Sequence, residues 1–291
     1  LLKLSGEALA GDKKTGFDEA TCMGVAQQVK KLDLDASNLS TYSYSEGRVG
    51  YLEINCNRVT DEKVRKALLY AMDRKAMDDA AFESSEYYSI PYTFLPTNSQ
   101  FYTEDGVEKY EQDVDKAKSM LEDAGVSGLK LKLGYMSSDA VQSAQALLIQ
   151  EQLKEVGVTV ELAGGDGTAI ANAMKDPDNE YDMYLGGYIM GIDPDTFSSL
   201  FENDGAYNYM HYSGYDTIDQ LFEEGRSELD ESARKETYAK LQAAVQDTGA
   251  FYPIISNNKI LVVNNRIQGV EDAGLVPVYT FEDTSSLKIA E

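Results

Sequence analysis

The stretch YDMYLGGYIMGIDPDTFSSLF, residues Tyr181 to Phe201, is the segment around which the rest of the chain is organised. Its apolar and aromatic residues lead into Gly186-Gly187 and then Tyr188, as a buried strand that ends at glycines does. A turn at Gly191 follows, and Asp193-Pro194-Asp195 predicts the start of a helix. Ligands of α/β folds bind beyond the carboxyl ends of strands. The stretch therefore predicts either the floor of a ligand cleft or a core strand, a turn and a capped helix.

Composition limits the classes of function. The 291 residues are enough for one large domain or two ordinary ones. With 26 basic and 50 acidic residues the formal net charge is -24, which opposes contact with nucleic-acid phosphates or an anionic membrane. We therefore expect no nucleic-acid partner. The single histidine removes most histidine-based catalytic and metal sites, so we expect no catalytic residues, no metal and no cofactor.

The two cysteines and the start of the chain give little information about function. Cys22 and Cys56 have no CxxC spacing, and we expect free thiols. No apolar run approaches the ~20 residues that span a bilayer. The chain begins at Leu1 without an initiator Met and without a visible signal peptide, so we treat its start as incomplete.

The first residues predict a strand, a glycine loop and a helix. LLKLSGEALAG resembles the N-terminus of bacterial UMP kinase, of the amino-acid kinase family. That resemblance implies that Lys3, Ser5 and Gly6 contact nucleotide phosphates. It covers about a tenth of the chain, and about thirty residues cannot bury a kinase core. We therefore expect residues 1–31 to be a segment joined to a different protein, with a nucleotide (UMP) kinase as the alternative function.

A different character begins near residue 32. Ser40 to Asn55 predicts two strands with a bend at Glu46-Gly47, and Thr60 is the expected N-cap of a helix with an apolar stripe. This passage resembles the family 5 solute-binding proteins of ABC importers, which take up oligopeptides, dipeptides, nickel chelates and related solutes. The matching residues are Asn55, Asp61, Val64, Arg65, Ala67, Leu68, Ala71, Asp73 and Arg74.

The following segments alternate between strand and helix patterns. A helix at Asp113–Gly125 precedes a strand at Leu129–Tyr135, a helix at Ala140–Val156 and a strand at Val158–Leu162. Strand, helix and strand in this order predict a right-handed parallel crossover. Gly164 to Thr168 lacks the lysine of a P-loop, and we interpret it as a turn before a helix.

The last third predicts two helices and two strands. The helices are expected at Ile218–Leu229 and Glu231–Gln246. Phe251–Ile255 and Ile260–Val263 are expected to form a hairpin around Asn257-Asn258. The tail from Val276 to Ala290 has a strand-like pattern and resembles the natural C-terminus of the same family.

The resemblance also suggests a ligand site in the opening stretch. In the family a strand, "GW", a loop and "DP" follow one another, and many peptide binders place there an Asp that pairs with the ligand's amine. Here Tyr188 replaces the Trp, and Met190 or Gly191 occupies the place of that Asp. Asp193 is either its substitute or only the N-cap of the helix.

The passage AYNYMHYSGY supplies further candidates. The family has a similar passage at the edge of its cleft, so Tyr207, Asn208 and Tyr212 are expected ligand contacts. The alternative is a rigid loop wedged between domains. We interpret His211 as a loop histidine rather than a metal ligand.

These patterns together predict an α/β fold, the C-terminal lobe of a type II periplasmic-binding-protein-like structure with hinge strands, from which most of the first lobe is missing. The expected parts are a kinase-like segment at 1–31, hinge strands at 32–59, solute-binding lobe II at 60–265, and a return to lobe I at 266–291. A third possible function is a hydrolase built on Asp193 and Asp195, but two such acids at a helix start are more often cap and dipole partners.

The implied function is binding of a solute, most simply a peptide, without enzymatic chemistry. The implied partners are the permease and ATPase subunits of an ABC transporter. The implied location is outside the cytoplasmic membrane, with a lipid anchor in the full-length form. The sequence leaves the choice of solute and the oligomeric state open.

Overall fold

The computed structural model of this protein describes residues 38–82, 84–189, 193–277 and 279–290. The chain divides into two compact units, one formed by Ser45–Asn258 and the other by the chain ends, Leu1–Tyr44 and Lys259–Glu291. The predicted segment at 1–31, with Lys3, Ser5, Gly6 and Cys22, lies outside the described residues. The predicted boundaries at residues 31, 59 and 265 stay predictions.

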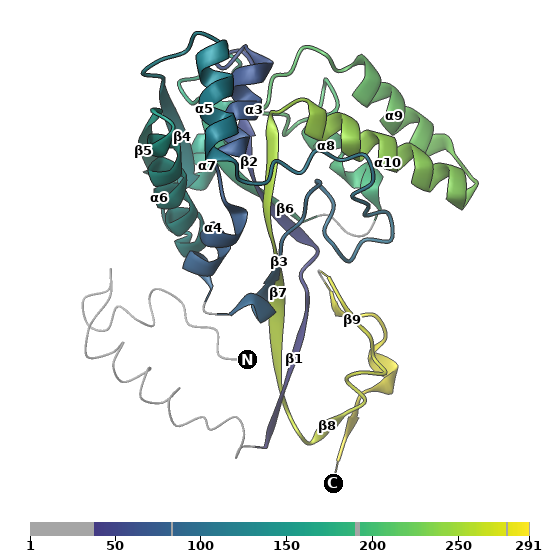
Figure 1. Cartoon of the computed structure of the whole chain (residues 1–291). Coiled ribbons are helices and arrows are strands. Elements are labelled where there is room, and N and C mark those ends of the chain that lie inside the picture. Colours follow the sequence, from purple (N-terminus) through teal and green to yellow (C-terminus); the bar gives the residue numbers. More distant parts are fainter. Residues whose placement is uncertain (1–37, 83, 190–192, 278, 291) are drawn as a thin grey trace, which may run out of the picture. The chain divides into compact units, whose positions relative to one another are not determined.

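The larger unit is built on a mixed β-sheet with the strand order β7-β2-β6-β4-β5 (Figure 1). Strand β4 is parallel to both β5 and β6, whereas β2 is antiparallel to its neighbours β6 and β7. The parallel β4–α6–β5 crossover predicted from the sequence is confirmed. The strands of this sheet are β2 (Arg48–Ile54), β4 (Lys130–Met136), β5 (Thr159–Gly165), β6 (Met183–Ile189) and β7 (Phe251–Asn264).

Eight described α-helices cover the sheet, and six of them have an aspartate N-cap whose carboxylate accepts a backbone N–H of the first turn. The expectation that Thr60 caps the first of them is wrong, because Asp61 accepts the N–H of Lys63 at 2.8 Å. The helices are α3 (Glu62–Tyr70), α4 (Arg74–Ala81), α5 (Val114–Asp123), α6 (Ala140–Glu155), α7 (Gly167–Met174), α8 (Ser198–Phe201), α9 (Asp216–Ser227) and α10 (Glu231–Asp247).

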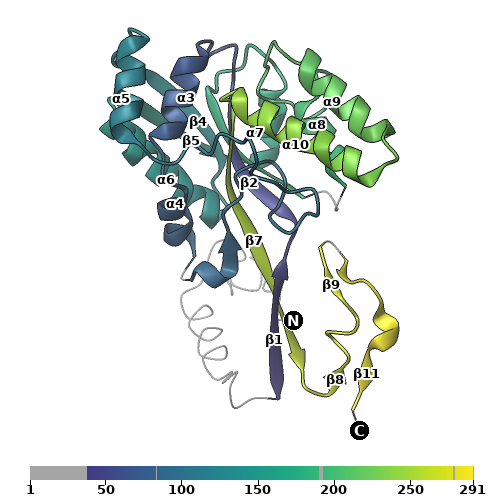
Figure 2. The same cartoon turned by 45° about the vertical axis from the view of Figure 1, so that its right-hand side comes forward.

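The two larger hydrophobic cores lie on opposite faces of the sheet because strand side chains alternate between those faces. Leu52 and Ile54 of β2 belong to the first core, on the side of α3, α4, α5 and α6. Tyr51 belongs to the second core, which contains Phe222 of α9 and Tyr238 of α10. Figure 2 shows these two groups of helices on opposite sides of the sheet. The unit is therefore a three-layer α/β structure.

The predicted hairpin at Asn257-Asn258 is wrong, because β7 runs without a turn through 14 residues. Both asparagine side chains bond outside the strand. Asn257 Nδ2 donates to Glu46 Oε2 at 2.5 Å, and Asn258 Nδ2 donates to the carbonyl of Glu86 at 3.0 Å. The short strand β3 (Tyr88–Ser89) also pairs with β7 at Asn257. These bonds tie the two side-chain amides to groups outside β7, while Oδ1 of Asn257 is buried without a hydrogen-bond partner among the described residues.

Two carboxyl groups are completely buried in this unit. Both oxygens of Glu53 on β2 lack a hydrogen-bond partner within the described ranges, and burial raises the pKa of this carboxyl well above its usual range. On α4, Asp78 Oδ1 accepts from Gln145 Nε2 at 3.5 Å, whereas its Oδ2 has no hydrogen-bond partner among the described residues, and burial raises the pKa of Asp78 to about 8. Burial thus favours the protonated form of both carboxyl groups, and Asp78, with a pKa of about 8, is mostly protonated in the folded protein at pH 7.

The smaller unit contains β1 (Leu39–Ser45), which neighbours β7, and short strands near the C-terminus. The backbone N–H of Asn265 donates to the carbonyl of Asn38 at 2.7 Å. The strand-like tail is confirmed as short pieces, in which β9 (Leu275–Val276) pairs with β10 (Thr280–Phe281) and β8 (Ile267–Gln268) with β11 (Lys288–Ile289). Nowhere in the described ranges is a helix long and apolar enough to cross a membrane.

Candidate functional site

The candidate site lies where β4, β5 and β6 end, which we name the carboxyl edge of the sheet. The N–H of Ser137, just after β4, donates to the carbonyl of Gly165 at the end of β5. At the end of β6, Ile189 stands opposite Arg48, the first residue of antiparallel β2. Crevices at such edges are the usual ligand sites of open α/β sheets.

Tyr188 lies at this edge on the side of the second core. Its ring contacts Phe197 at a centroid distance of 5.4 Å and Tyr207 at 6.1 Å. Its hydroxyl shares a hydrogen bond of 2.5 Å with Ser199 Oγ. Tyr188 is half-buried and Tyr207 is 46% exposed, so the sequence-predicted pair forms an aromatic surface open to solvent.

Asp193 is both a cap and an ion-pair partner. Its Oδ1 accepts the N–H of Asp195 at the start of the 3-10 helix η3 (Pro194–Phe197). Its two oxygens also accept from Arg234 Nη2 of α10, at 2.8 and 2.9 Å. The sequence alternative of an N-cap is therefore present. A ligand amine would have to share this carboxylate with Arg234.

Asn208 and Tyr212 belong to a hydrogen-bonded loop. Asn208 is buried, donates to the carbonyl of Glu202 and accepts from the Tyr215 hydroxyl at 2.8 Å. The backbone N–H of Tyr212 donates to the same hydroxyl at 2.7 Å. Tyr212 itself is half-buried, with its ring 5.7 Å from that of Tyr215. The side chain of Asn208 thus holds the loop, and that of Tyr212 retains some access to solvent.

Two predicted contacts, Met190 and Gly191, lie outside the described residues. The His211 ring bonds through Nε2 to the carbonyl of Met174 at 2.8 Å, in agreement with a loop histidine. Within the described ranges, no three side chains of His, Cys, Asp or Glu are grouped closely enough to hold a metal ion.

A pocket at the carboxyl edge contains a residue that sequence reasoning missed, Arg48. The pocket has a volume of about 380 Å³ and lies on the side of the sheet that faces α4 and α6. Its lining residues are Glu46, Arg48, Phe82, Met136, Asp139, Val141, Ile255 and Asn257. The available signal was the GRVG run at 47–50 together with Gly186-Gly187, since glycines mark a close approach to the backbone.

The two glycines of β6 make room for different side chains. A Cβ at Gly186 would lie 2.6 Å from Cε2 of Tyr51, and one at Gly187 would lie 1.9 Å from Nη2 of Arg48. Below them, burial raises the pKa of Tyr184 to about 12, so its hydroxyl stays protonated. Gly186 therefore leaves room for Tyr51 in the second core, whereas Gly187 leaves room for Arg48 in the pocket.

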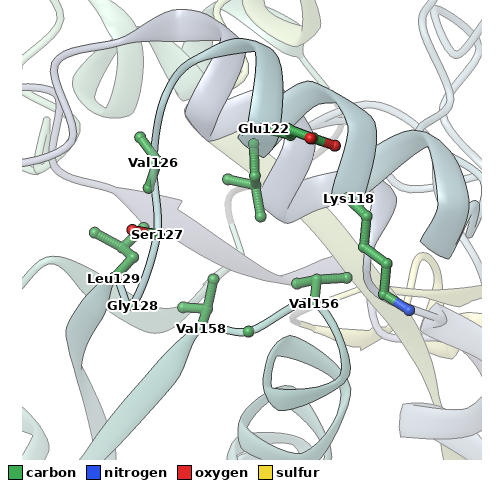
Figure 3. A pocket seen from close by; sticks show the side chains of 10 residues that line it. Lys118, Glu122, Val126, Ser127, Gly128, Leu129, Val156 and Val158 are labelled. Atoms are coloured by element: carbon green, nitrogen blue, oxygen red, sulfur yellow. The ribbon is translucent and has the colours of Figure 1, made fainter.

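A second cavity, of about 270 Å³, lies at the opposite edge of the sheet, near the amino ends of β4 and β5. Figure 3 shows that apolar side chains of Val126, Leu129, Val156 and Val158 line it, with Lys118 and Glu122 at the side. Its place at the amino ends of the strands distinguishes it from the carboxyl edge, where ligands of such sheets bind.

Comparison with known proteins gives a family match over residues 19–209, to the profile described as "Bacterial extracellular solute-binding proteins, family 5 Middle". The match begins inside the segment predicted at 1–31. Among solved structures, the chain is similar to the crystal structure of the ABC transporter substrate binding protein CtaP from Listeria monocytogenes. The two sequences are 34% identical, and the two folds superpose with a TM-score of 0.83. That alignment covers 95% of this chain and 59% of the other.

Two curated relatives have peptide-binding names. The oligopeptide-binding protein AppA of Bacillus subtilis (strain 168) is 26% identical over 277 residues, 88% of this chain and 49% of AppA. The dipeptide-binding protein of Escherichia coli (strain K12) is 26% identical over 231 residues, 76% of this chain and 42% of that protein. The chain thus spans about half the length of these relatives. Their names give the nucleotide-kinase alternative no support.

Proposed function

The chain belongs to family 5 of the bacterial extracellular solute-binding proteins, and from this membership we propose that it binds a peptide for uptake by an ABC importer. Its task is recognition, and we propose no enzymatic activity. The observation that supports peptide binding most directly is the aromatic surface of Tyr188 and Tyr207 at the carboxyl edge of the sheet.

Aromatic side chains suit a peptide ligand because they offer apolar area together with hydrogen-bonding hydroxyls. The ring of Tyr188, near the end of β6, lies 6.1 Å from that of Tyr207, and both Tyr207 and Tyr212 belong to the loop between α8 and α9. We assign ligand contact to these three tyrosines. Asp193 and Asn208 remain predicted contacts, and both support the loops around the site through the bonds described above. Met190 and Gly191 remain predicted contacts from their place after β6.

The proposed partners follow from the family. A binding protein of an importer delivers its solute to permease subunits that ATPase subunits drive, and we propose such partners here. We also propose a location outside the cytoplasmic membrane, with a lipid anchor in the full-length form. Peptide-binding names among the relatives favour peptides over other solutes.

The test is a binding measurement with defined peptides. Native mass spectrometry of the protein with an equimolar mixture of tri-, tetra- and pentapeptides identifies the ligands that are retained, and isothermal titration calorimetry then gives their affinities. We expect Tyr207→Ala to weaken binding by about 2- to 10-fold, the equivalent of one aromatic contact.

The matched control is Tyr279→Ala in the smaller unit, where Tyr279 is 83% exposed. This substitution removes an equally large side chain and should leave affinity unchanged. If Tyr207→Ala and Tyr279→Ala behave alike, the tyrosines at the end of β6 are not the ligand surface. If no peptide in the mixture is retained, peptide binding by this chain is refuted.

A further inference from the structure

Arg48 is a cation that lines the pocket at the carboxyl edge. Among the described residues, no hydrogen bond or ion pair ties its guanidinium to another group, although the group has five N–H donors. By contrast, Arg58, Arg226 and Arg234 all pair with carboxylates. The donors of Arg48 therefore remain available to solvent or to a ligand.

The sheet is shaped to hold this guanidinium in place. Gly50 of β2 and Gly187 of β6 are cross-strand partners, and Arg48 precedes Gly50 by two residues, so it lies on the same face. A Cβ at Gly50 would lie 3.4 Å from Nη1 of Arg48, and one at Gly187 would lie 1.9 Å from Nη2. The guanidinium therefore lies against the backbone of Gly187, where any side chain would displace it, and it reaches ordinary contact distance of Gly50.

The rest of the pocket suits one end of a peptide. Phe82, Met136, Val141 and Ile255 supply apolar wall, and the volume of about 380 Å³ accommodates a ligand group of residue size. Two acids also line it, and both are engaged. Asp139 Oδ1 caps α6, and Glu46 Oε2 accepts from Asn257.

The acidic charge of the whole protein makes a local cation such as Arg48 necessary for binding an anionic ligand group. A net charge of -24 repels anionic solutes at long range, so binding of a carboxylate requires a local positive group. A guanidinium matches a carboxylate with two parallel N–H···O bonds, and such bonds to charged groups are the strong ones.

We propose that Arg48 binds a carboxylate of the solute and so determines specificity for peptides that present one in this pocket. The inference rests on the proposed function and adds a residue and a ligand group to it. The carboxylate comes either from the peptide's C-terminus or from an acidic side chain, and both have the same chemistry.

The experiment compares four forms of one peptide that the wild-type protein binds: free or amidated C-terminus, each with Glu or Gln at one internal position. Calorimetry on wild-type protein should show that removing one of the two carboxylates weakens binding by about 10- to 100-fold. The form that loses affinity identifies the source of the carboxylate. In Arg48→Gln this discrimination should disappear, and Arg48→Lys should restore part of it.

Arg266→Gln is the matched control, because Arg266 is exposed in the smaller unit and the chemical change is the same. Circular dichroism should show both variants folded, since no protein acceptor is lost at Arg48. Equal discrimination by wild-type protein and Arg48→Gln overturns the inference. The inference is also overturned if the wild-type protein binds all four forms with equal affinity, a result that leaves the proposal of peptide binding intact. A wild-type protein that binds no peptide refutes both proposals.

Discussion

Replacement of Asp78 by Asn should make the protein more stable at neutral pH. Asp78 is completely buried on α4, and burial raises its pKa to about 8. In the unfolded chain the pKa of an aspartate is about 3.9. Folding therefore requires uptake of a proton whenever the pH lies between these two values. Asn has the shape of the protonated group and needs no proton.

The magnitude follows from linkage between protonation and folding. A raised pKa in the folded state gives stability that is complete below pH ~3.9 and is lost as the pH rises towards 8. The loss is about 1.4 kcal/mol for each pH unit. At pH 7 the variant should therefore exceed the wild-type protein by about 4 kcal/mol, and at pH 5 by about 1.5 kcal/mol.

The assay is urea unfolding followed by far-UV circular dichroism at pH 4, 5, 6, 7 and 8, on wild-type protein and variant in parallel. The difference between the two at each pH cancels the titration of all other groups. Asp79→Asn on the same helix is the control, because bonds from Lys75 and Tyr88 lower the pKa of Asp79. That variant should not gain stability as the pH rises. A difference for Asp78→Asn that stays constant from pH 4 to 8 would refute the reasoning.

Three further outcomes are expected. Glu53→Gln should also gain stability relative to wild-type protein as the pH rises above ~4.3, measured by the same urea series, and a flat difference contradicts a raised pKa of Glu53. Tyr188→Phe should lower the free energy of unfolding by about 1 kcal/mol because the bond to Ser199 is lost; a loss above ~3 kcal/mol would mean that the ring has moved. Arg65→Met should cost about 3 kcal/mol or more in thermal unfolding, because the buried guanidinium donates to the carbonyls of Val59, Thr60 and Thr248; an unchanged midpoint contradicts this.

Local signals of the sequence predicted most of the elements. The alternation at Leu129–Tyr135 predicts β4, and the helical stripe at Ala140–Val156 predicts α6. Each predicted boundary agrees with the structure to within one residue. Aspartates mark helix starts because their short carboxylates reach the free N–H groups of the first turn. These predictions were correct because they depend only on residues close together in the sequence.

Predictions failed where distant residues decide the outcome. Asn257 and Asn258 have turn propensity, but Glu46 and Glu86 bind their side chains and hold the strand extended. Arg48 could not be recognised from its own surroundings either. Its position depends on the register that sets Gly50 opposite Gly187, and that pairing joins parts of the chain far apart in the sequence.

The position of β2 has a consequence for the order in which the protein folds. This strand lies in the middle of the sheet and is antiparallel to both neighbours, β6 (Met183–Ile189) and β7 (Phe251–Asn264). Among the sheet strands of the larger unit it leaves the ribosome first, but its last partner arrives about 200 residues later, roughly 10 to 40 s at ordinary translation rates. Until then β2 has at least one open edge, where strands of other chains can add. Synthesis of Phe251–Ile255 therefore completes the sheet, and a chaperone that shields β2 during this interval should raise the yield of folded protein.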